Sequence, residues 1–181
     1  MVLVNPMLLE PLIRMVLPAI FSLSRALFTS STSANRRNPL PSAAVAGYKP
    51  QNNRSQLTET GRNHLVVDAY NANPTSMAAA IDNFSMIQAP DKMLILGDMR
   101  ELGDVSQAEH TNIVDMLKRK GFTQVWLVGS EFGKAAQGAG FRLFPDVEAV
   151  NVALSKEPVA GKTILIKGSN SIGLTKTITN L

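Results

Sequence analysis

The 181-residue sequence predicts an α/β fold, with a mostly parallel sheet and helices on both of its faces. Two observations support this prediction. Short runs of aliphatic and β-branched residues recur along the chain, and longer segments between them have apolar residues at every third or fourth position. Strands and helices that alternate in this way form parallel sheets, because each helix returns the chain to the same end of the sheet.

The first strand and helix of this pattern lie in residues 64–88. His64–Asp68 is predicted to be a strand and Pro74–Gln88 a helix. The apolar face of that helix comprises Met77, Ile81, Phe84 and Ile87. Asn73 suits the N-cap because its side-chain oxygen can accept a free N–H of the first turn, and proline suits the position after it. The preceding segment, Lys49–Arg62, is polar, and we expect it to be a loop.

The next strand and helix carry a start signal and a stop signal. Lys92–Gly97 is apolar and is predicted to be a buried strand. Ser106 and Glu109 match a capping box, so we expect a helix from Ser106 to about Lys120. Gly121 would end this helix, since glycine tolerates the left-handed conformation that often follows a helix.

The last third of the chain is predicted to contain shorter elements. The strands are Gln124–Val128, Phe141–Phe144 and Thr163–Lys167; the helices are Ser130–Gln137, a helix that Asp146 caps, and a final helix that ends at about Asn180. The order of the strands in the sheet cannot be read from the sequence.

Polar residues follow four of the predicted strands, in Asp68–Asn73, Asp98–Gly103, Gly129–Glu131 and Lys167–Ser171. Because the carboxyl ends of parallel strands share one edge of a sheet, these four loops predict a binding cleft at that edge. The helix that begins at Pro74 would also offer free N–H groups to an anion. Taken singly, each polar residue could equally serve a turn, a helix cap or a solvated surface.

Composition and incomplete motifs argue against several kinds of chemistry. The chain has no Cys, which excludes disulfides and thiolate nucleophiles. Gly129–Lys134 has too few residues between its glycines for a phosphate-binding loop. With only His64 and His110 as histidines, we predict no metal site, and no residue stands out as a nucleophile. The net charge of +4 comes from residues 1–50 and the remainder is balanced, so we expect no nucleic-acid binding.

Residues 1–47 differ from the rest of the chain. They begin apolar but are interrupted by proline and arginine, so we expect no stable insertion into a membrane. They then become rich in Ser, Asn, Arg and Pro, which is typical of linkers. An organelle transit peptide is one interpretation. We favour another, in which residues 1–47 are a non-globular leader that is foreign to the fold.

Four stretches occur in a fixed order: Asp68–Met77, Gly97–Gly103, Glu109-His110 and Ile166–Ser171. Together they resemble the C-terminal domain of the Mur ligases of peptidoglycan synthesis, over roughly residues 46–181. The first two are typical of the member that adds D-alanyl-D-alanine to UDP-N-acetylmuramoyl-tripeptide. The resemblance implies a Rossmann-like domain in residues 63–181. Residues 48–62 look like a remnant of the family's central domain, at its junction with the last one.

The resemblance also implies an activity. In the family, ATP and magnesium convert the tripeptide carboxylate to an acyl phosphate, which the amine of D-alanyl-D-alanine attacks. The central domain holds the phosphates on a Gly-Lys-Thr loop, and no complete loop of this kind occurs in these 181 residues, because Gly161-Lys162-Thr163 has Lys156 where the motif needs its first glycine. We therefore expect ATP and magnesium to be held mainly by a central domain, and this chain to be inactive by itself. The implied setting is cytoplasmic and the expected state a monomer. The alternative is a stand-alone module that binds a nucleotide or a partner without catalysis.

By resemblance, Asp68 would accept hydrogen bonds from the ribose of ATP, since an ionised carboxylate is a strong acceptor for hydroxyls. Arg54 would contact the nucleotide from the interdomain junction. The other implied site residues are Tyr70, Asn71 and Asn73 on the nucleotide side of the cleft, and Lys167, Ser169 and Asn170 facing the dipeptide or the transferring carboxyl group. A lysine there could offset developing negative charge. No catalytic residue is predicted within the chain.

Overall fold

The computed structural model describes residues 56–181, so the predicted leader and Arg54 lie outside the described residues. The described residues form a sheet with the strand order β1-β2-β6-β3-β4-β5. The strands are β1 Gln56–Glu59, β2 His64–Asp68, β3 Lys92–Gly97, β4 Val125–Val128, β5 Arg142–Phe144 and β6 Thr163–Lys167. Strands β2 to β6 run parallel, and β1 pairs antiparallel with β2. The predicted α/β class is confirmed.

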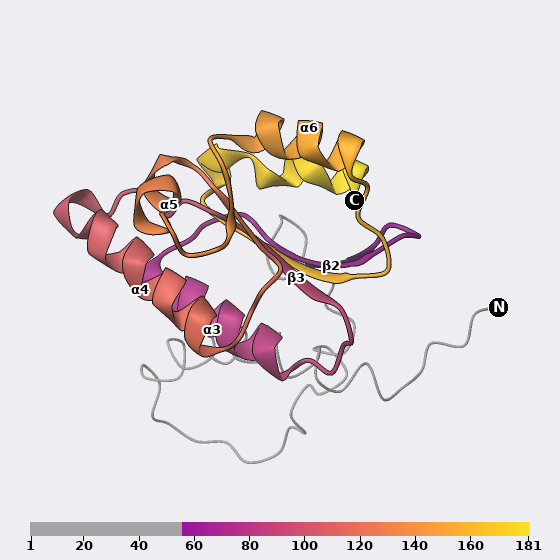
Figure 1. Cartoon of the computed structure of the whole chain (residues 1–181), viewed down its shortest axis with the longest axis horizontal. Helices are drawn as coiled ribbons and strands as arrows, with labels where there is room; N and C mark the ends of the chain where they lie inside the picture. The colour runs from indigo at the N-terminus through magenta and orange to yellow at the C-terminus, as the bar shows by residue number, and fades with distance from the viewer. Residues whose placement is uncertain (1–55) are drawn as a thin grey trace, which may run out of the picture. The chain divides into compact units, whose positions relative to one another are not determined.

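Helices cover both faces of the sheet, as predicted. The α-helices are α3 Pro74–Met86, α4 Ser106–Arg119, α5 Ser130–Ala135 and α6 Val147–Lys156; the 3-10 helices are η2 Gly103–Val105, η3 Asn170–Ile172 and η4 Leu174–Asn180. Figure 1 shows α3 and α4 on one face, and α6 with η4 on the other. Within residues 56–181, no helix is both long enough and apolar enough to cross a membrane.

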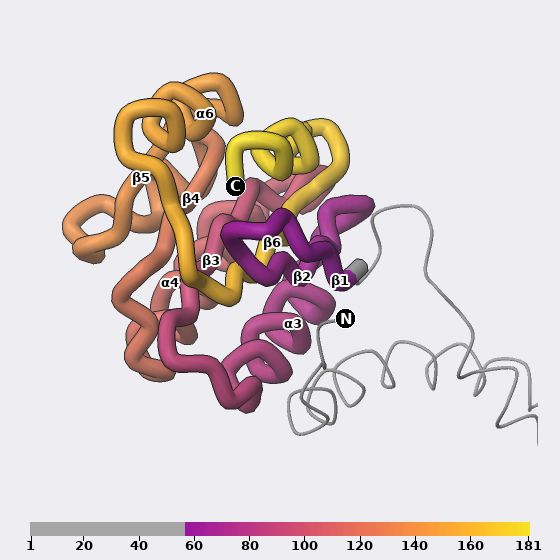
Figure 2. The backbone as a smooth tube through the Cα atoms, turned by 90° about the vertical axis from the view of Figure 1, so that its right-hand side faces the viewer, coloured from indigo at the N-terminus to yellow at the C-terminus, as the bar shows by residue number. Residues whose placement is uncertain are grey.

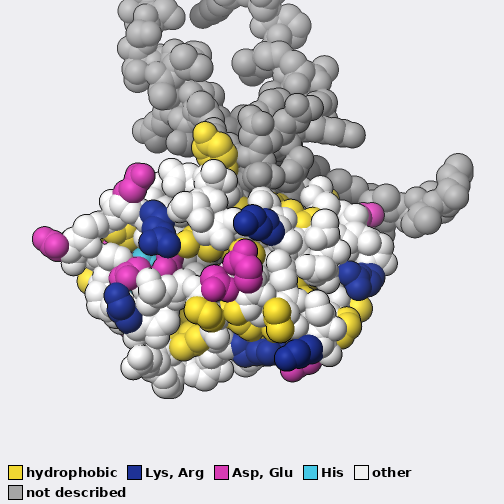
Figure 3. Space-filling model, turned by 90° about the horizontal axis from the view of Figure 1, so that it is seen from above, with side chains coloured by type: hydrophobic (Ala, Val, Ile, Leu, Met, Phe, Trp, Pro, Cys, Tyr) yellow, Lys and Arg dark blue, Asp and Glu magenta, His cyan; other side chains and the backbone are white. Residues whose placement is uncertain are grey.

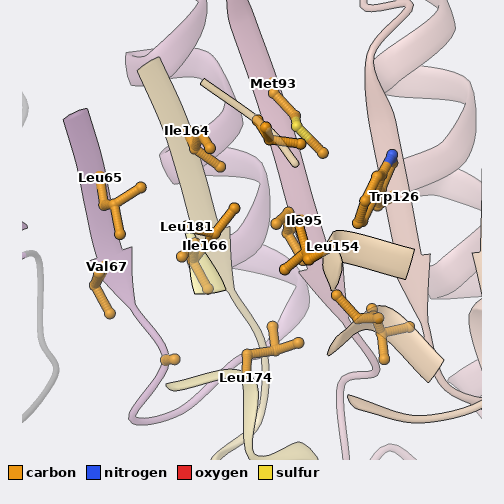
Figure 4. Close-up of a cluster of buried hydrophobic side chains, with 14 of the residues drawn as sticks. Leu65, Val67, Met93, Ile95, Trp126, Leu154, Ile164, Ile166, Leu174 and Leu181 are labelled. Carbon is orange, nitrogen blue, oxygen red and sulfur yellow. The ribbon is translucent and has the colours of Figure 1, made fainter. Parts of the chain in front are cut away.

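The sheet divides the core into two layers because successive strand side chains point to opposite faces. In one layer, Leu65, Ile95 and Ile164 of three strands pack with Leu154 of α6 and Leu174 of η4 (Figure 4). The alternate strand residues face α3 and α4, and the buried side chains there include Val66, Leu94, Leu165, Met77, Ile81, Phe84, Ile113 and Leu117. Both faces of the sheet are thereby packed, so the loops at the carboxyl ends of the strands start from a rigid base.

Two predicted helix starts and one predicted stop are confirmed. Asn73 caps α3: its side chain accepts the N–H of Ser76, and the Ser76 hydroxyl accepts the N–H of Asn73. Asp146 caps α6 by accepting the N–H of Ala149 at 2.8 Å. Gly121 follows the C-cap of α4 with a φ of 73°, the left-handed region that glycine enters without strain.

Three local predictions were wrong. Residues 56–59 form β1 rather than a loop, because the free edge of β2 supplies backbone partners even to a polar segment. The capping box at Ser106 is absent: η2 runs directly into α4, so Ser106 already has helical angles and cannot serve as an extended N-cap. The final helix ends at Asn180 as predicted, but the segment forms two 3-10 helices, with Gly173 in the left-handed region between them, rather than one continuous helix.

The C-terminus is tied to the turn between β1 and β2. The carbonyl of Leu181 accepts hydrogen bonds from the side chains of Asn63 and Thr60. Figure 2 shows the C-terminus close to the turn that joins these strands. This contact lies at the amino ends of the parallel strands, so that edge of the sheet is closed by the chain itself.

Candidate functional site

The predicted site lies at the carboxyl edge of the parallel strands. Strands β2, β6 and β3 are neighbours in the sheet, and the loops that follow them start side by side. The edge brings together Asp68 at the end of β2, Lys167 at the end of β6, and Ser169 in the loop after β6. Open α/β sheets bind ligands beyond the carboxyl ends of their strands, so this edge is the candidate site.

Asp68 and Lys167 form an ion pair across β2 and β6. They are directly opposite each other in the register, and Lys167 Nζ lies 2.6 Å from Asp68 Oδ2. The same ammonium donates to the backbone carbonyl of Asn71 at 3.2 Å. The side chain of Lys167 is 1% exposed, whereas that of Asp68 is 22% exposed. The carboxylate, and not the ammonium, therefore faces the solvent.

The loop after β3 is held to its neighbours by consecutive backbone groups. The N–H of Met99 donates to Nε2 of His110 at 3.0 Å, and the N–H of Arg100 donates to Oγ of Ser169 at 2.9 Å. Nδ1 of His110 lies 2.7 Å from the carbonyl of Ser106 and donates to it. Because Nε2 accepts and Nδ1 donates, His110 is a neutral imidazole, so its 3.8 Å approach to the buried Asp98 is not an ion pair.

Asp98 closes the start of helix α5. Its two carboxylate oxygens accept the N–H groups of Glu131 at 3.1 Å and Phe132 at 2.9 Å. Gly129 makes room for this carboxylate: a Cβ at that position would lie 2.3 Å from Asp98 Cγ. Asp98 already occupies the position of a bound anion, so the structure supports the exclusion of a phosphate-binding loop here.

The remaining predicted residues occupy the rim of the same edge. Tyr70 and Asn71 are exposed in the turn after β2, where Oδ1 of Asn71 accepts the N–H of Ala72. Asn73 is exposed, and its side chain caps α3. Asn170 is exposed at the start of η3. Their predicted contacts with substrates stay predictions.

The residues predicted for the site did not include Asp98 and His110, although both are completely buried and hold the loops at this edge in place. A signal was present, since Asp98 directly follows a buried strand and both residues stand in stretches that carry the family resemblance. Periodicity could not reveal their partners, which come from α5 and from the loop that precedes α4. Among residues 56–181, no group of three His, Asp or Glu side chains could hold a metal ion.

A pocket lies at the opposite, amino edge of the sheet. Its lining includes Met93, Trp126, Arg142 and Glu157, and it contains none of the predicted site residues. The guanidinium of Arg142 stacks 4.7 Å from the Trp126 ring and pairs with Glu157 at 2.7 Å. These groups satisfy one another, so the pocket does not compete with the carboxyl edge as the candidate site.

The face covered by α6 and η4 carries charges of both signs. Figure 3 shows Lys and Arg side chains interspersed with Asp and Glu side chains on this face. One such contact is the exposed pair of Lys176 and Glu148 at 3.8 Å. The face therefore has no extended field of one sign, and the absence of nucleic-acid binding stays a prediction.

A comparison with known proteins assigns this fold and its candidate site to a family. The sequence model of the family described as "Mur ligase, glutamate ligase domain" matches residues 53–170, so the chain belongs to the Mur ligase family. The resemblance inferred from the four stretches is confirmed.

Individual relatives show which member of the family the chain is similar to. UDP-N-acetylmuramoyl-tripeptide–D-alanyl-D-alanine ligase of Treponema pallidum is 29% identical over 171 residues, covering 90% of this chain and 37% of that protein. The ligase of the same name from Mycobacterium tuberculosis is 32% identical over 160 residues, covering 73% of this chain and 31% of that protein. This chain therefore spans about a third of the length of these relatives. A match over 90% of the chain extends into residues 1–47, whose separate origin stays a prediction.

A solved structure agrees with the fold. The crystal structure of MurF from Acinetobacter baumannii superposes with a TM-score of 0.64 and 25% identity, covering 77% of this chain and 33% of that one. The Rossmann-like expectation for the described residues is thereby confirmed.

Proposed function

We propose that this chain supplies the C-terminal domain of an ATP-dependent ligase that joins D-alanyl-D-alanine to UDP-N-acetylmuramoyl-tripeptide. The observation that carries the proposal is that relatives from distant bacteria bear this same ligase name and match the chain over most of its length. The proposal sets the reaction in the cytoplasm, in peptidoglycan synthesis, with a monomer as the working state.

Within this ligase, the chain binds and orients substrates. The partly exposed carboxylate of Asp68 accepts hydrogen bonds from the ribose hydroxyls of ATP. The turn that contains Tyr70, Asn71 and Asn73 lines the nucleotide side, while exposed Asn170 faces the dipeptide and buried Ser169 holds the loop after β3 through the Arg100 N–H. ATP supplies the activation of the tripeptide carboxylate as an acyl phosphate. The described residues offer no cluster of metal ligands, so we assign no magnesium site to them.

The test is a chimera in which residues 48–181 replace the matching third of the Mycobacterium tuberculosis relative. Phosphate release from ATP should depend on both the tripeptide substrate and D-alanyl-D-alanine. Asp68→Ala in this chimera should raise the KM for ATP about tenfold, the effect of losing one charge-assisted hydrogen bond. Asp91→Ala is the matched control, because Asp91 is exposed at the opposite edge of the sheet.

The 181-residue chain by itself should release no phosphate with the same substrates, because its Gly161-Lys162-Thr163 lacks the first glycine of a phosphate-binding loop and leads into β6. Turnover by this chain above background would contradict the assignment of the phosphates to another domain. A folded chimera that binds adenine nucleotides but never ligates would favour the alternative function, a binding module without catalysis. An unchanged KM for Asp68→Ala would remove Asp68 from the nucleotide site.

A further inference from the structure

We propose that Lys167 is a positioning residue, which holds the Asp68 carboxylate and the adjacent turn in the orientation that receives the ribose. This inference rests on the proposed function, since it deepens the nucleotide role of Asp68. It revises the role implied by the family resemblance, in which Lys167 faces the dipeptide or the transferring carboxyl group.

Lys167 and Asp68 differ in their exposure to solvent, and this difference gives them different roles. Lys167 is among the largest fully buried side chains, and its ammonium contacts Asp68 Oδ2 at 2.6 Å. A dipeptide could reach this ammonium only if the Asp68 carboxylate or the turn at Asn71 moved away from it. Asp68 keeps part of its surface open to solvent, so a ligand can reach the carboxylate without any such movement.

The ion pair also selects the oxygen that is available to a ligand. Oδ2 of Asp68 accepts from Lys167, and within residues 56–181 no hydrogen bond reaches Oδ1. The ammonium therefore fixes the rotation of the carboxylate and leaves Oδ1 as the acceptor for a hydroxyl. A buried ammonium needs such a partner, because an unpaired charge away from water is strongly disfavoured.

A second contact extends the effect to the neighbouring turn. Lys167 Nζ also donates to the carbonyl of Asn71, two residues before the N-cap of α3. One ammonium thus joins the end of β2, the end of β6 and the turn that starts α3. Preorganisation of this kind lets a ligand bind without first ordering the groups that contact it.

The test compares two probes on the full 181-residue chain by NMR titration: adenosine, and 2′,3′-dideoxyadenosine, which lacks both ribose hydroxyls. The unchanged chain should prefer adenosine by about tenfold, the effect of a charge-assisted hydrogen bond. Lys167→Met should abolish this preference although it leaves Asp68 in place, and Asp68→Ala should do the same. The double variant Asp68→Ala/Lys167→Met should show no further loss, because both residues act through one contact.

Lys162→Met is the matched control, since it removes a lysine just before the other end of β6 and should keep the tenfold preference. Retention of the preference by Lys167→Met would overturn the positioning role and leave the proposed function intact. No preference in the unchanged chain would overturn the nucleotide role of Asp68 and, with it, this inference.

A further measurement needs no variant and applies even if Lys167→Met does not fold. The side-chain ¹⁵N signal of Lys167 in the unchanged chain should respond to adenosine and not to D-alanyl-D-alanine. The opposite pattern would show that Lys167 contacts the dipeptide, and would overturn the inference.

Discussion

Different kinds of side chain join the loops at the two edges of the parallel sheet, the amino ends and the carboxyl ends of its strands. At the amino edge, Asn63 is 3% exposed and its neutral amide joins three segments. It donates to the carbonyls of Val159 at 2.8 Å and of Leu181, and its oxygen accepts the N–H of Lys162 at 3.0 Å. Every polar atom of this side chain is used within the fold.

At the carboxyl edge, ionised side chains make the corresponding connections. Asp98 holds the start of α5, and Lys167 holds the end of β2 through Asp68. Burying charges is an inefficient way to stabilise a fold, because desolvation offsets much of the attraction. Asn63 shows that a buried neutral side chain can join such loops, and the ion pair of Arg142 and Glu157 at the same amino edge is exposed. The partly exposed carboxylate of Asp68 at the carboxyl edge is therefore better explained by ligand binding than by closure.

The largest expected effect is on the charged edge, at Gly129. Its φ of 118° and ψ of 169° lie in a region that is almost exclusive to glycine, and an added Cβ would overlap Asp98. We expect Gly129→Ala to lower the free energy of unfolding by about 4 kcal/mol, from backbone strain and overpacking together. Urea unfolding measures this change.

Gly133→Ala is the control for this variant. Gly133 lies inside α5 with no heavy atom within 4 Å of an added Cβ, so alanine should be neutral or stabilising there. Similar unfolding curves for the two variants would show that the Asp98 carboxylate can move away from α5, and that this edge is less rigid than the contacts indicate.

A smaller effect is expected at the amino edge, from Asn63→Ala. The variant removes three hydrogen bonds of its side chain, two of them buried, each contributing about 1 kcal/mol, so the free energy of unfolding should fall by about 3 kcal/mol. The preference of the chain for adenosine over the dideoxy probe should not change, because the edge is remote from Asp68. If the folded variant lost that preference, ligand binding would depend on the amino edge as well as on the carboxyl edge, and the two edges would not differ in function.

Local sequence signals predicted much of this fold. The parallel strands, the face of α3 and the caps at Asn73 and Asp146 follow from periodicity and from residue preferences near a helix end. The predicted cap at Ser106 was wrong because a 3-10 turn precedes it, and the strand at residues 56–59 was missed because its partner strand decides it. The sequence predicted contacts between residues that are close along the chain, but it did not predict which strands pair in the sheet.

The same limit applies to the candidate site. The rule that polar loops gather at the carboxyl edge correctly placed Asp68, Lys167 and Ser169 together. The sequence could not show that Lys167 faces Asp68, because that contact depends on β6 lying beside β2, 99 residues apart along the chain. It also could not show that Asp98 is buried, because its partners belong to α5.

The smallest expected effect comes from an exposed ion pair beside the charged edge. Lys134 lies 2.9 Å from Glu131, and its hydrogen bond holds the pKa of Glu131 below the ordinary value of 4.5. A lowered acid pKa stabilises the fold above the unfolded-state value, and this stabilisation disappears as the pH falls through the folded-state pKa. Lys134→Gln should therefore raise the pKa of Glu131, which a ¹³C NMR titration of its carboxyl group measures. Because Lys134 is 62% exposed, the free energy of unfolding at pH 7 should fall by only about 0.3 kcal/mol, and the difference should vanish in acid.

Lys118→Gln, in the last turn of α4, controls for the loss of a positive charge near a helix end. If Lys134→Gln destabilised the chain as much as Asn63→Ala, charge in the exposed part of this edge would itself hold the fold together, and the contrast between the two edges would fail.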